Sequence, residues 1–148
     1  MTASRTNDQL SVAEHRLSIA LRAMSIVFLV FFGAAFFGVL FEIRVPDPLP
    51  MMLRWGHGGE AYELMIASIY IVWAVFLWRA ARDPLANRTF LDFTVAANAV
   101  HFGLMLIQGI LMHGEHTHLV GDILLMWIVL IPVAILWLLV RRDTEPGT

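Results

Sequence analysis

The sequence predicts an all-α membrane protein, with four transmembrane helices in an antiparallel bundle. The chain has 148 residues, of which 59% are hydrophobic and only 15% are charged. Soluble domains contain about 45–50% apolar and about 25% charged residues, so this composition indicates a chain that lies in lipid. Four apolar runs approach the ~20 residues that a helix needs to cross ~30 Å of hydrocarbon. Because lipid admits only helices and closed barrels, and these runs are too long for strands, we expect four helices.

The four predicted spans follow one another with short connections. They cover residues 17–41, 61–78, 90–112 and 119–140. A polar lead of residues 1–16 precedes the transmembrane domain, which ends at residue 142, and residues 143–148 form a tail. The first span is not interpreted as a signal peptide, because it is too long for one and no cleavage-site pattern of small residues follows it.

The placement of arginine predicts the orientation of the bundle. The chain has ten Arg residues and no Lys. Only Arg44 and Arg54 lie on the side that holds loops 42–60 and 113–118. The other eight lie on the side of the lead and the tail: Arg5, Arg16, Arg22, Arg79, Arg82, Arg88, Arg141 and Arg142. Because basic residues are enriched in cytoplasmic segments, both termini are predicted to be cytoplasmic and the two loops to face outward.

Two features near the cytoplasmic ends have structural interpretations. Trp78 and Trp137 lie at the ends of spans, where interfacial Trp is expected. The sequence "TFLD" at 89–92 fits a capping box in which Thr89 is the N-cap of the third span. The charge of Asp92 is also favoured at a helix N-terminus, and we expect it close to the arginines of the preceding loop, Arg79, Arg82 and Arg88.

A polar face runs along the third span. Five residues spaced alternately by three and four share one side of the predicted helix: Asn98, His101, Met105, Gln108 and Met112. Lipid cannot satisfy such a face, so we expect it to look into the bundle. Tyr70, near the middle of the second span, is predicted to form a hydrogen bond with His101. Two roles stay open for this face, namely interhelical hydrogen bonding and the handling of a ligand or of protons.

A cluster of His and acidic residues is expected at the outer side, around the stretch "HGEHTHLVGD" at 113–122. The predicted metal ligands are His57, Glu63, His113, His116, His118 and Asp122. Imidazole and carboxylate ligands suit a divalent transition metal such as Zn or Cu, and the chain has no Cys to add thiolates. Two other interpretations stay open, a pH-responsive cluster and a solvated loop, because the helix dipole favours acids in a first turn without any metal.

The stretch "YELMIASIYIVWAVFLWRAARDPLANRTFLDFTVAANAVHFGLMLIQG", followed by "HLVGD", carries a family resemblance. It resembles an uncharacterised family of small bacterial four-span membrane proteins with a domain of unknown function, and its most specific part is the "AARDPLANR" turn with the F-x-D-F that follows. The chain is also loosely similar in size and layout to DoxX-like membrane proteins. The resemblance implies the bacterial cytoplasmic (inner) membrane and, by its DoxX-like aspect, a quinone or redox partner. It carries over no catalytic residue.

The sequence favours two functions and keeps two alternatives. It contains no nucleophile–base pair and no nucleotide-binding motif, so an enzyme is not favoured, and a net charge of −2 gives no reason to expect nucleic acid. We expect a non-enzymatic accessory protein that packs against a larger membrane complex or a second copy, or a metal-binding protein. The alternatives are a subunit that seats a quinone near His101 and a minimal transporter or proton path. A bis-His haem is not expected, because only His101 lies within a span.

The predicted topology is testable because the chain has no native Cys. Thr148→Cys should stay unlabelled when intact cells are treated with a membrane-impermeant thiol reagent, since the tail is predicted to be cytoplasmic. Thr117→Cys, in the predicted outer loop, should be labelled under the same conditions. Labelling is read as a mass shift of the purified protein. A labelled Thr148→Cys in intact cells would contradict the topology.

Overall fold

The structure, a computed structural model, describes residues 2–43, residue 46 and residues 59–144, with the backbone alone described for residues 2–11 and 143–144. This part of the chain contains helices and no β-strand, which confirms the predicted all-α class. The four long helices are α1 (Thr2–Leu40), α3 (Glu60–Ala80), α4 (Arg88–Leu111) and α5 (Asp122–Thr144). Two short 3-10 helices precede α4 and α5, namely η1 (Leu85–Asn87) and η2 (His116–Val120).

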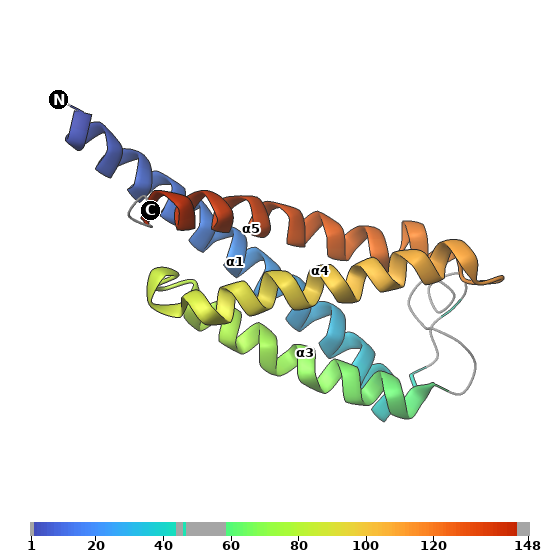
Figure 1. The fold of residues 1–148 in the computed structure, drawn as a ribbon. Helices are drawn as coiled ribbons and strands as arrows, with labels where there is room; N and C mark the ends of the chain where they lie inside the picture. Colours follow the sequence, from blue (N-terminus) through green and yellow to red (C-terminus); the bar gives the residue numbers. More distant parts are fainter. Residues whose placement is uncertain (1, 44–45, 47–58, 145–148) are drawn as a thin grey trace.

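Two helices, α1 and α5, begin three or more residues away from the predicted start of their span. The polar lead continues into the first span, so α1 is one helix of 39 residues whose N-terminal part projects beyond the other helices (Figure 1). α5 begins at Asp122 and not at residue 119, because residues 116–120 form η2. Gly121, with φ −97° and ψ −118°, then interrupts the helical path before α5 begins.

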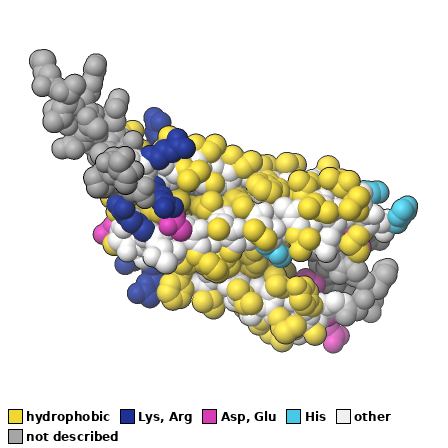
Figure 2. Space-filling view, viewed as in Figure 1, with side chains coloured by type: hydrophobic (Ala, Val, Ile, Leu, Met, Phe, Trp, Pro, Cys, Tyr) yellow, Lys and Arg dark blue, Asp and Glu magenta, His cyan; other side chains and the backbone are white. Residues whose placement is uncertain are grey.

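The outside of the bundle is suited to lipid. Each of the four helices contains a segment long and apolar enough to cross a membrane: Val12–Leu40, Glu60–Ala80, Leu85–Leu111 with η1, and His116–Arg142 with η2. Large apolar side chains face outward, and Val100 is 74% exposed. Figure 2 shows such side chains covering the length of the bundle. Because soluble proteins rarely expose apolar surface on this scale, the chain is a multi-pass membrane protein in contact with the lipid bilayer.

The two ends of the bundle differ in charge. Both ends of the described chain lie at one end, where dark blue basic side chains gather (Figures 1 and 2). This arginine end carries Arg79, Arg82, Arg88, Arg141 and Arg142. The opposite, histidine end carries His113, His116 and His118. The side of the membrane that each end faces stays a prediction.

Helix α1 has the most extensive contacts: it packs along both α3 and α5, and α4 packs along α5. Small side chains on α3 allow the close approach of α1, because Ala67 and Ala74 are buried at a spacing of seven residues and Ala81 continues the series. Ser25 of α1 donates a hydrogen bond to the carbonyl oxygen of Ala74 at 2.7 Å. Close backbone approach and hydrogen bonds of this kind are the usual basis of helix association in lipid.

Helices α3 and α4 are joined near mid-span by a polar clamp made of Tyr70, Trp73, Thr94 and Asn98. The Tyr70 hydroxyl donates to Asn98 Oδ1 at 3.2 Å, and Trp73 Nε1 donates to Thr94 Oγ1 at 3.0 Å. Asn98 Nδ2 in turn donates to the Thr94 carbonyl oxygen at 2.8 Å. The predicted hydrogen bond between Tyr70 and His101 is therefore wrong. Their ring centroids lie 5.9 Å apart, and the hydroxyl of Tyr70 reaches Asn98 instead.

Asp92 joins α4 to α5 at the arginine end. Its Oδ1 accepts a hydrogen bond from Trp137 Nε1 at 2.9 Å and one from Arg141 Nη1 at 2.9 Å. Its ion pair is with Arg141 in the last turn of α5. The expected proximity of Asp92 to the arginines of the preceding loop stays a prediction. Trp137 is 1% exposed and packs in the core, so it does not face lipid, whereas Trp78 is 43% exposed. The interfacial depth of both residues stays a prediction.

The predicted capping box at the start of the third span is also wrong. α4 begins at Arg88 with Asn87 as the N-cap, and no side-chain hydrogen bond caps it. The chain enters α4 directly from η1, so Thr89 already stands inside the helix and its hydroxyl is not at the N-cap position.

Two substitutions of Asp92 separate its hydrogen bond from its ion pair. Asp92→Leu should lower the free energy of unfolding by about 1–3 kcal/mol, because the buried indole N–H of Trp137 loses its acceptor. Asp92→Asn retains an oxygen acceptor and removes only a half-exposed ion pair, so its cost should be about 0–1 kcal/mol. Denaturant titrations in detergent micelles measure both values. Equal decreases in the free energy of unfolding for the two variants would show that the hydrogen bond from Trp137 to Asp92 does not contribute to stability.

Candidate functional site

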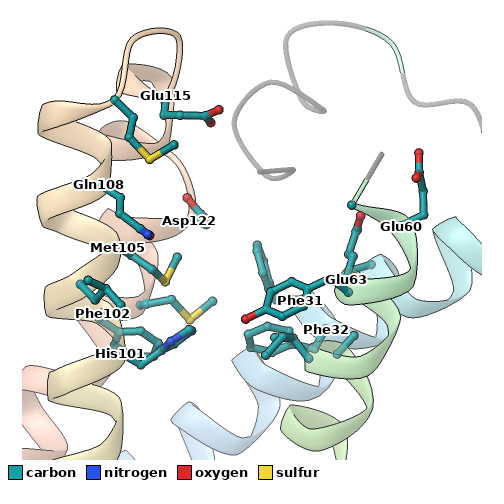
Figure 3. A pocket seen from close by; sticks show the side chains of 18 residues that line it. Phe31, Phe32, Glu60, Glu63, His101, Phe102, Met105, Gln108, Glu115 and Asp122 are labelled. Carbon is teal, nitrogen blue, oxygen red and sulfur yellow. The ribbon is translucent and has the colours of Figure 1, made fainter. Parts of the chain in front are cut away.

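A pocket of about 480 Å³ lies in the histidine-end half of the bundle. Figure 2 shows a hollow between the histidine-end halves of α3 and α4, with acidic side chains at its edge. Figure 3 shows its interior. The walls come from all four long helices and from the segment before η2. The lining includes Phe31, Phe32, Ala35, Glu63, His101, Phe102, Met105, Gln108, Met112, Glu115, Asp122 and Met126.

A glycine lies where α4 packs against α5 and η2. A Cβ at the buried Gly109 would lie 2.9 Å from Ile123 Cδ1 and 3.1 Å from Leu119 Cδ2, so a larger residue would require these side-chain ends to shift. His116 Nδ1 lies 2.8 Å from the carbonyl oxygen of Gly109 and ties η2 to the same turn. The polar clamp joins α3 to α4 only near the middle of the bundle. Between the clamp and the histidine end, α4 packs against α5, and the pocket occupies the space beside α3.

The polar face predicted for the third span lines this pocket. His101, Met105, Gln108 and Met112 all belong to the lining, and Asn98 is buried below them in the polar clamp. In Figure 3, Gln108 and Met105 project toward the opening, and His101 lies at its deeper end. Asn98, His101, Met105 and Gln108 therefore look into the bundle, as predicted, whereas Met112, at the end of α4, is 48% exposed.

The remaining wall combines aromatic rings with carboxylates. Figure 3 shows Phe31 and Phe32 of α1 on the inner side, Glu63 of α3 on one side, and Glu115 and Asp122 on the opposite side. Phe32 stacks on Tyr70, with ring centroids 4.1 Å apart, so the aromatic wall rests on the polar clamp. Aromatic rings thus occupy the deep part, and carboxylates the part near the histidine end.

Glu115 and Asp122 are held by a buried histidine. His118 is 0% exposed, and its Nδ1 lies 2.9 Å from Asp122 Oδ1 while its Nε2 lies 3.2 Å from Glu115 Oε2. The imidazole lies between the two carboxyl groups, and each of its ring nitrogens faces one of them. Glu115, His118 and Asp122 are called the acid–histidine triad below.

The structure brings two of the predicted metal ligands together. His118 contacts Asp122, as the spacing of four residues suggested, although His118 stands in η2 and Asp122 begins α5. Glu63 lies across the pocket from them (Figure 3). Both ring nitrogens of His118 face carboxylates, so a metal ligated by this ring would displace one of these contacts.

The other predicted ligands are dispersed. His113 is exposed, and His116 is engaged with the Gly109 carbonyl oxygen. His57 lies outside the described residues. Within the part of the chain that the structure describes, no three His or acidic side chains are grouped so as to hold a metal ion. The metal site stays a prediction.

Sequence reasoning missed Phe31, Phe32 and Gly109. The two Phe residues stand in a run that is apolar on every side, so no periodic signal distinguishes a wall of a pocket from a face in lipid. Gly109 resembles any glycine in an apolar span. The spacing of Glu115, His118 and Asp122 by three and four residues was the one signal that points to the triad.

Comparison with known proteins gives one family match. The model of a family of unknown function, DUF6632, matches residues 17–146. This match confirms the resemblance to a family of unknown function, while the DoxX-like and bacterial aspects of that resemblance stay predictions. No curated protein and no solved structure matches the chain.

The triad should contribute to stability. His118→Ala leaves two carboxylates facing each other without the imidazole that bridges them, so the free energy of unfolding should fall by about 3 kcal/mol, as when one partner of a buried charged pair is removed. His113→Ala, at an exposed position, is the matched control and should change little. Thermal and denaturant unfolding in detergent measure both. A His118→Ala protein as stable as the His113→Ala protein would contradict the bridging role.

Proposed function

We propose that this chain, which belongs to the DUF6632 family of unknown function, is a membrane-embedded binding protein that takes an amphipathic small molecule into the pocket between α3 and α4. The observation that carries the proposal is the pocket itself, which joins an aromatic interior to a polar rim inside a membrane-spanning bundle. A purely structural four-helix bundle has no need of such a space, because close packing of its helices provides its stability.

The size and the lining of the pocket support this proposal. Small-molecule sites are usually clefts of about 300–1,000 Å³ with mostly apolar walls and a few polar groups that fix orientation. The volume of about 480 Å³ falls in that range, and the lining consists mainly of Phe, Met and aliphatic side chains. Gln108 supplies both hydrogen-bond donors and an acceptor, and His101 supplies one ring nitrogen of each kind when neutral.

The position of the pocket supports entry from the bilayer. It lies in the histidine-end half of the bundle, between two helices whose outer faces are apolar. An apolar molecule dissolved in one leaflet can therefore reach it sideways, with its polar end near the rim. A quinone that seats its ring near His101 is one such molecule, and a substrate of a minimal transporter is another. Neither role requires the chain to be an enzyme.

A divalent transition metal is a second proposal, supported by the contact between His118 and Asp122. Its remaining ligands would come from Glu63 across the pocket and from His57 outside the described residues. The unfolding measurements on wild type and His118→Ala, repeated with Zn²⁺, Cu²⁺ and a chelator, test this proposal. A metal ligated by His118 stabilises only the wild type, because binding to the native state raises its stability by linkage.

Filling the pocket should abolish ligand binding. Ala35 lines the pocket, whereas its neighbour Ala34 is exposed on another face of α1. The probes are a short-chain quinone and three compounds with a phenylbutyl body and an ammonium, hydroxyl or carboxylate head. At least one probe should raise the melting temperature of wild type and of Ala34→Phe, but not of Ala35→Phe, where the added ring occupies the site.

Two controls show whether a loss of binding comes from filling the pocket. Size-exclusion chromatography and melting without ligand show whether Ala35→Phe is folded, and Met105→Trp, which fills the pocket from α4, provides an independent second variant. If every probe stabilises Ala35→Phe and Met105→Trp as much as wild type, the pocket is not a binding site.

A further inference from the structure

A second surface, separate from the pocket, lies along the seam between α1 and α3. We propose that this seam binds one phospholipid with an anionic head group, in the leaflet at the arginine end. The phosphate lies against Arg22 and Trp78, and an acyl chain follows the seam to an apolar groove beside Gly33. This site does not depend on what the pocket between α3 and α4 binds.

Arg22 places a charge on a helix face that is otherwise apolar. It is exposed, and Ile19 and Ile26, one turn away on either side, are 54% and 52% exposed. The guanidinium carbon of Arg22 lies 5.8 Å from the centroid of the Trp78 ring on α3. In the part of the chain that the structure describes, Arg22 has no ion pair with an acidic side chain. A guanidinium stacked on a ring keeps the N–H groups at its edge for hydrogen bonds, and their fork matches the oxygens of a phosphate.

The two helix stretches that form this part of the seam are basic. They face each other because Ser18 and Ser25 of α1 donate hydrogen bonds to the carbonyl oxygens of Ala81 and Ala74. Residues 15–29 and 64–82 contain no Asp or Glu but four Arg residues, namely Arg16, Arg22, Arg79 and Arg82. Basic residues between membrane-spanning helices attract anionic lipids. A zwitterionic head group adds an ammonium that these arginines repel, so the seam favours a head group with net negative charge.

An apolar groove of about 520 Å³ continues the seam toward the middle of the bundle, and Leu29, Gly33 and Ile71 are part of its lining. Leu29 and Gly33 follow Arg22 by seven and eleven residues, so they share its face of α1. Ile71 precedes Trp78 by seven residues on α3. A Cβ at Gly33 would have no atom within 4 Å, so the groove is open there. Eleven residues of helix rise about 16 Å, close to half of the ~30 Å hydrocarbon core, which suits a lipid of one leaflet.

A second copy of the chain fits this surface less well than a lipid does. Two copies inserted in the same orientation meet about a twofold axis along the membrane normal, so equivalent side chains face each other at one depth. The two Arg22 side chains would then be opposed in surroundings that screen charge weakly, and they would repel each other. An anionic lipid brings the opposite charge to the same place.

Native mass spectrometry of the full-length protein, released from micelles of an uncharged detergent, measures the affinity for each probe. The probes are phosphatidylglycerol and phosphatidylcholine with identical acyl chains, and glycerophosphoglycerol, which is the first head group without its chains. Wild type should bind phosphatidylglycerol at least about tenfold more tightly than phosphatidylcholine, a ratio that corresponds to about 1.4 kcal/mol. It should not bind glycerophosphoglycerol, because the groove then remains empty.

Two pairs of variants locate the site. Arg22→Gln should weaken binding of phosphatidylglycerol about tenfold, whereas Arg88→Gln, which removes a positive charge on α4 at the same end, should not change it. Gly33→Leu places a side chain in the groove and should weaken binding to a similar extent. Gly103→Leu, on α4 and with equally open space at its Cβ, is the matched control and should bind as wild type does. Melting without lipid shows that each variant is folded.

Four outcomes would overturn the inference. Equal binding of the two phospholipids to wild type would show no selection of an anionic head group. Equal losses within either pair of variants would show that the lipid is not held at this seam. Tight binding of glycerophosphoglycerol would show that a soluble phosphate, and not a lipid, is the ligand. A dimer that Gly33→Leu dissociates, without lipid bound to wild type, would show that a second copy occupies the groove.

The same measurement separates this inference from the proposed function. Ala35→Phe fills the pocket between α3 and α4, and Ala35 is not part of the lining of the groove. Ala35→Phe should therefore bind phosphatidylglycerol as tightly as wild type does. If Ala35→Phe loses the lipid while Gly33→Leu retains it, the lipid occupies the pocket and the seam is not a binding site.

Discussion

Hydrocarbon offers no hydrogen-bond partner, so a polar side chain inside a membrane span is stabilised when it finds its partner within the bundle. This constraint acts most strongly on α4, whose polar side chains cannot face lipid. Thr94 and Asn98 meet Trp73 and Tyr70 of α3, and these contacts form the polar clamp. The clamp fixes the rotation of α4 about its axis. That rotation then turns the residues farther along the same face, from His101 to Gln108, toward the interior.

The pocket results from this fixed rotation combined with close packing at one position. The clamp joins α3 and α4 near mid-span, and Gly109 allows α4 to lie against Ile123 and Leu119 near the histidine end. Helix α4 is thus held against α3 at the polar clamp and against α5 and η2 near the histidine end. The pocket is the space that remains beside α3. The acid–histidine triad closes the α5 side of that space. The position and the shape of the pocket therefore follow from a small number of contacts.

The sequence predicted the parts of this arrangement that depend on one helix at a time. Apolar length predicts the four spans, and the alternating spacing from Asn98 to Met112 predicts an inward face. Properties that depend on two helices could not be obtained in this way. The partner of Tyr70 is Asn98 and not His101, because the relative height of two helices is set by packing that one sequence window does not contain. The same holds for Asp92, whose partners lie 45 and 49 residues away in α5.

The most direct test of this account is a nuclear Overhauser measurement on the full-length protein in micelles, with Met and Thr methyl groups and the Tyr, Trp, Asn and Glu side chains labelled. The polar clamp predicts cross-peaks between the Tyr70 ring and the Asn98 side-chain amide, and between the Trp73 indole and the Thr94 methyl group. The pocket predicts that the Met105 methyl group shows no cross-peak to the side chain of Glu63 on the opposite wall. Strong cross-peaks between Met105 and Glu63, or none between Tyr70 and Asn98, would contradict it.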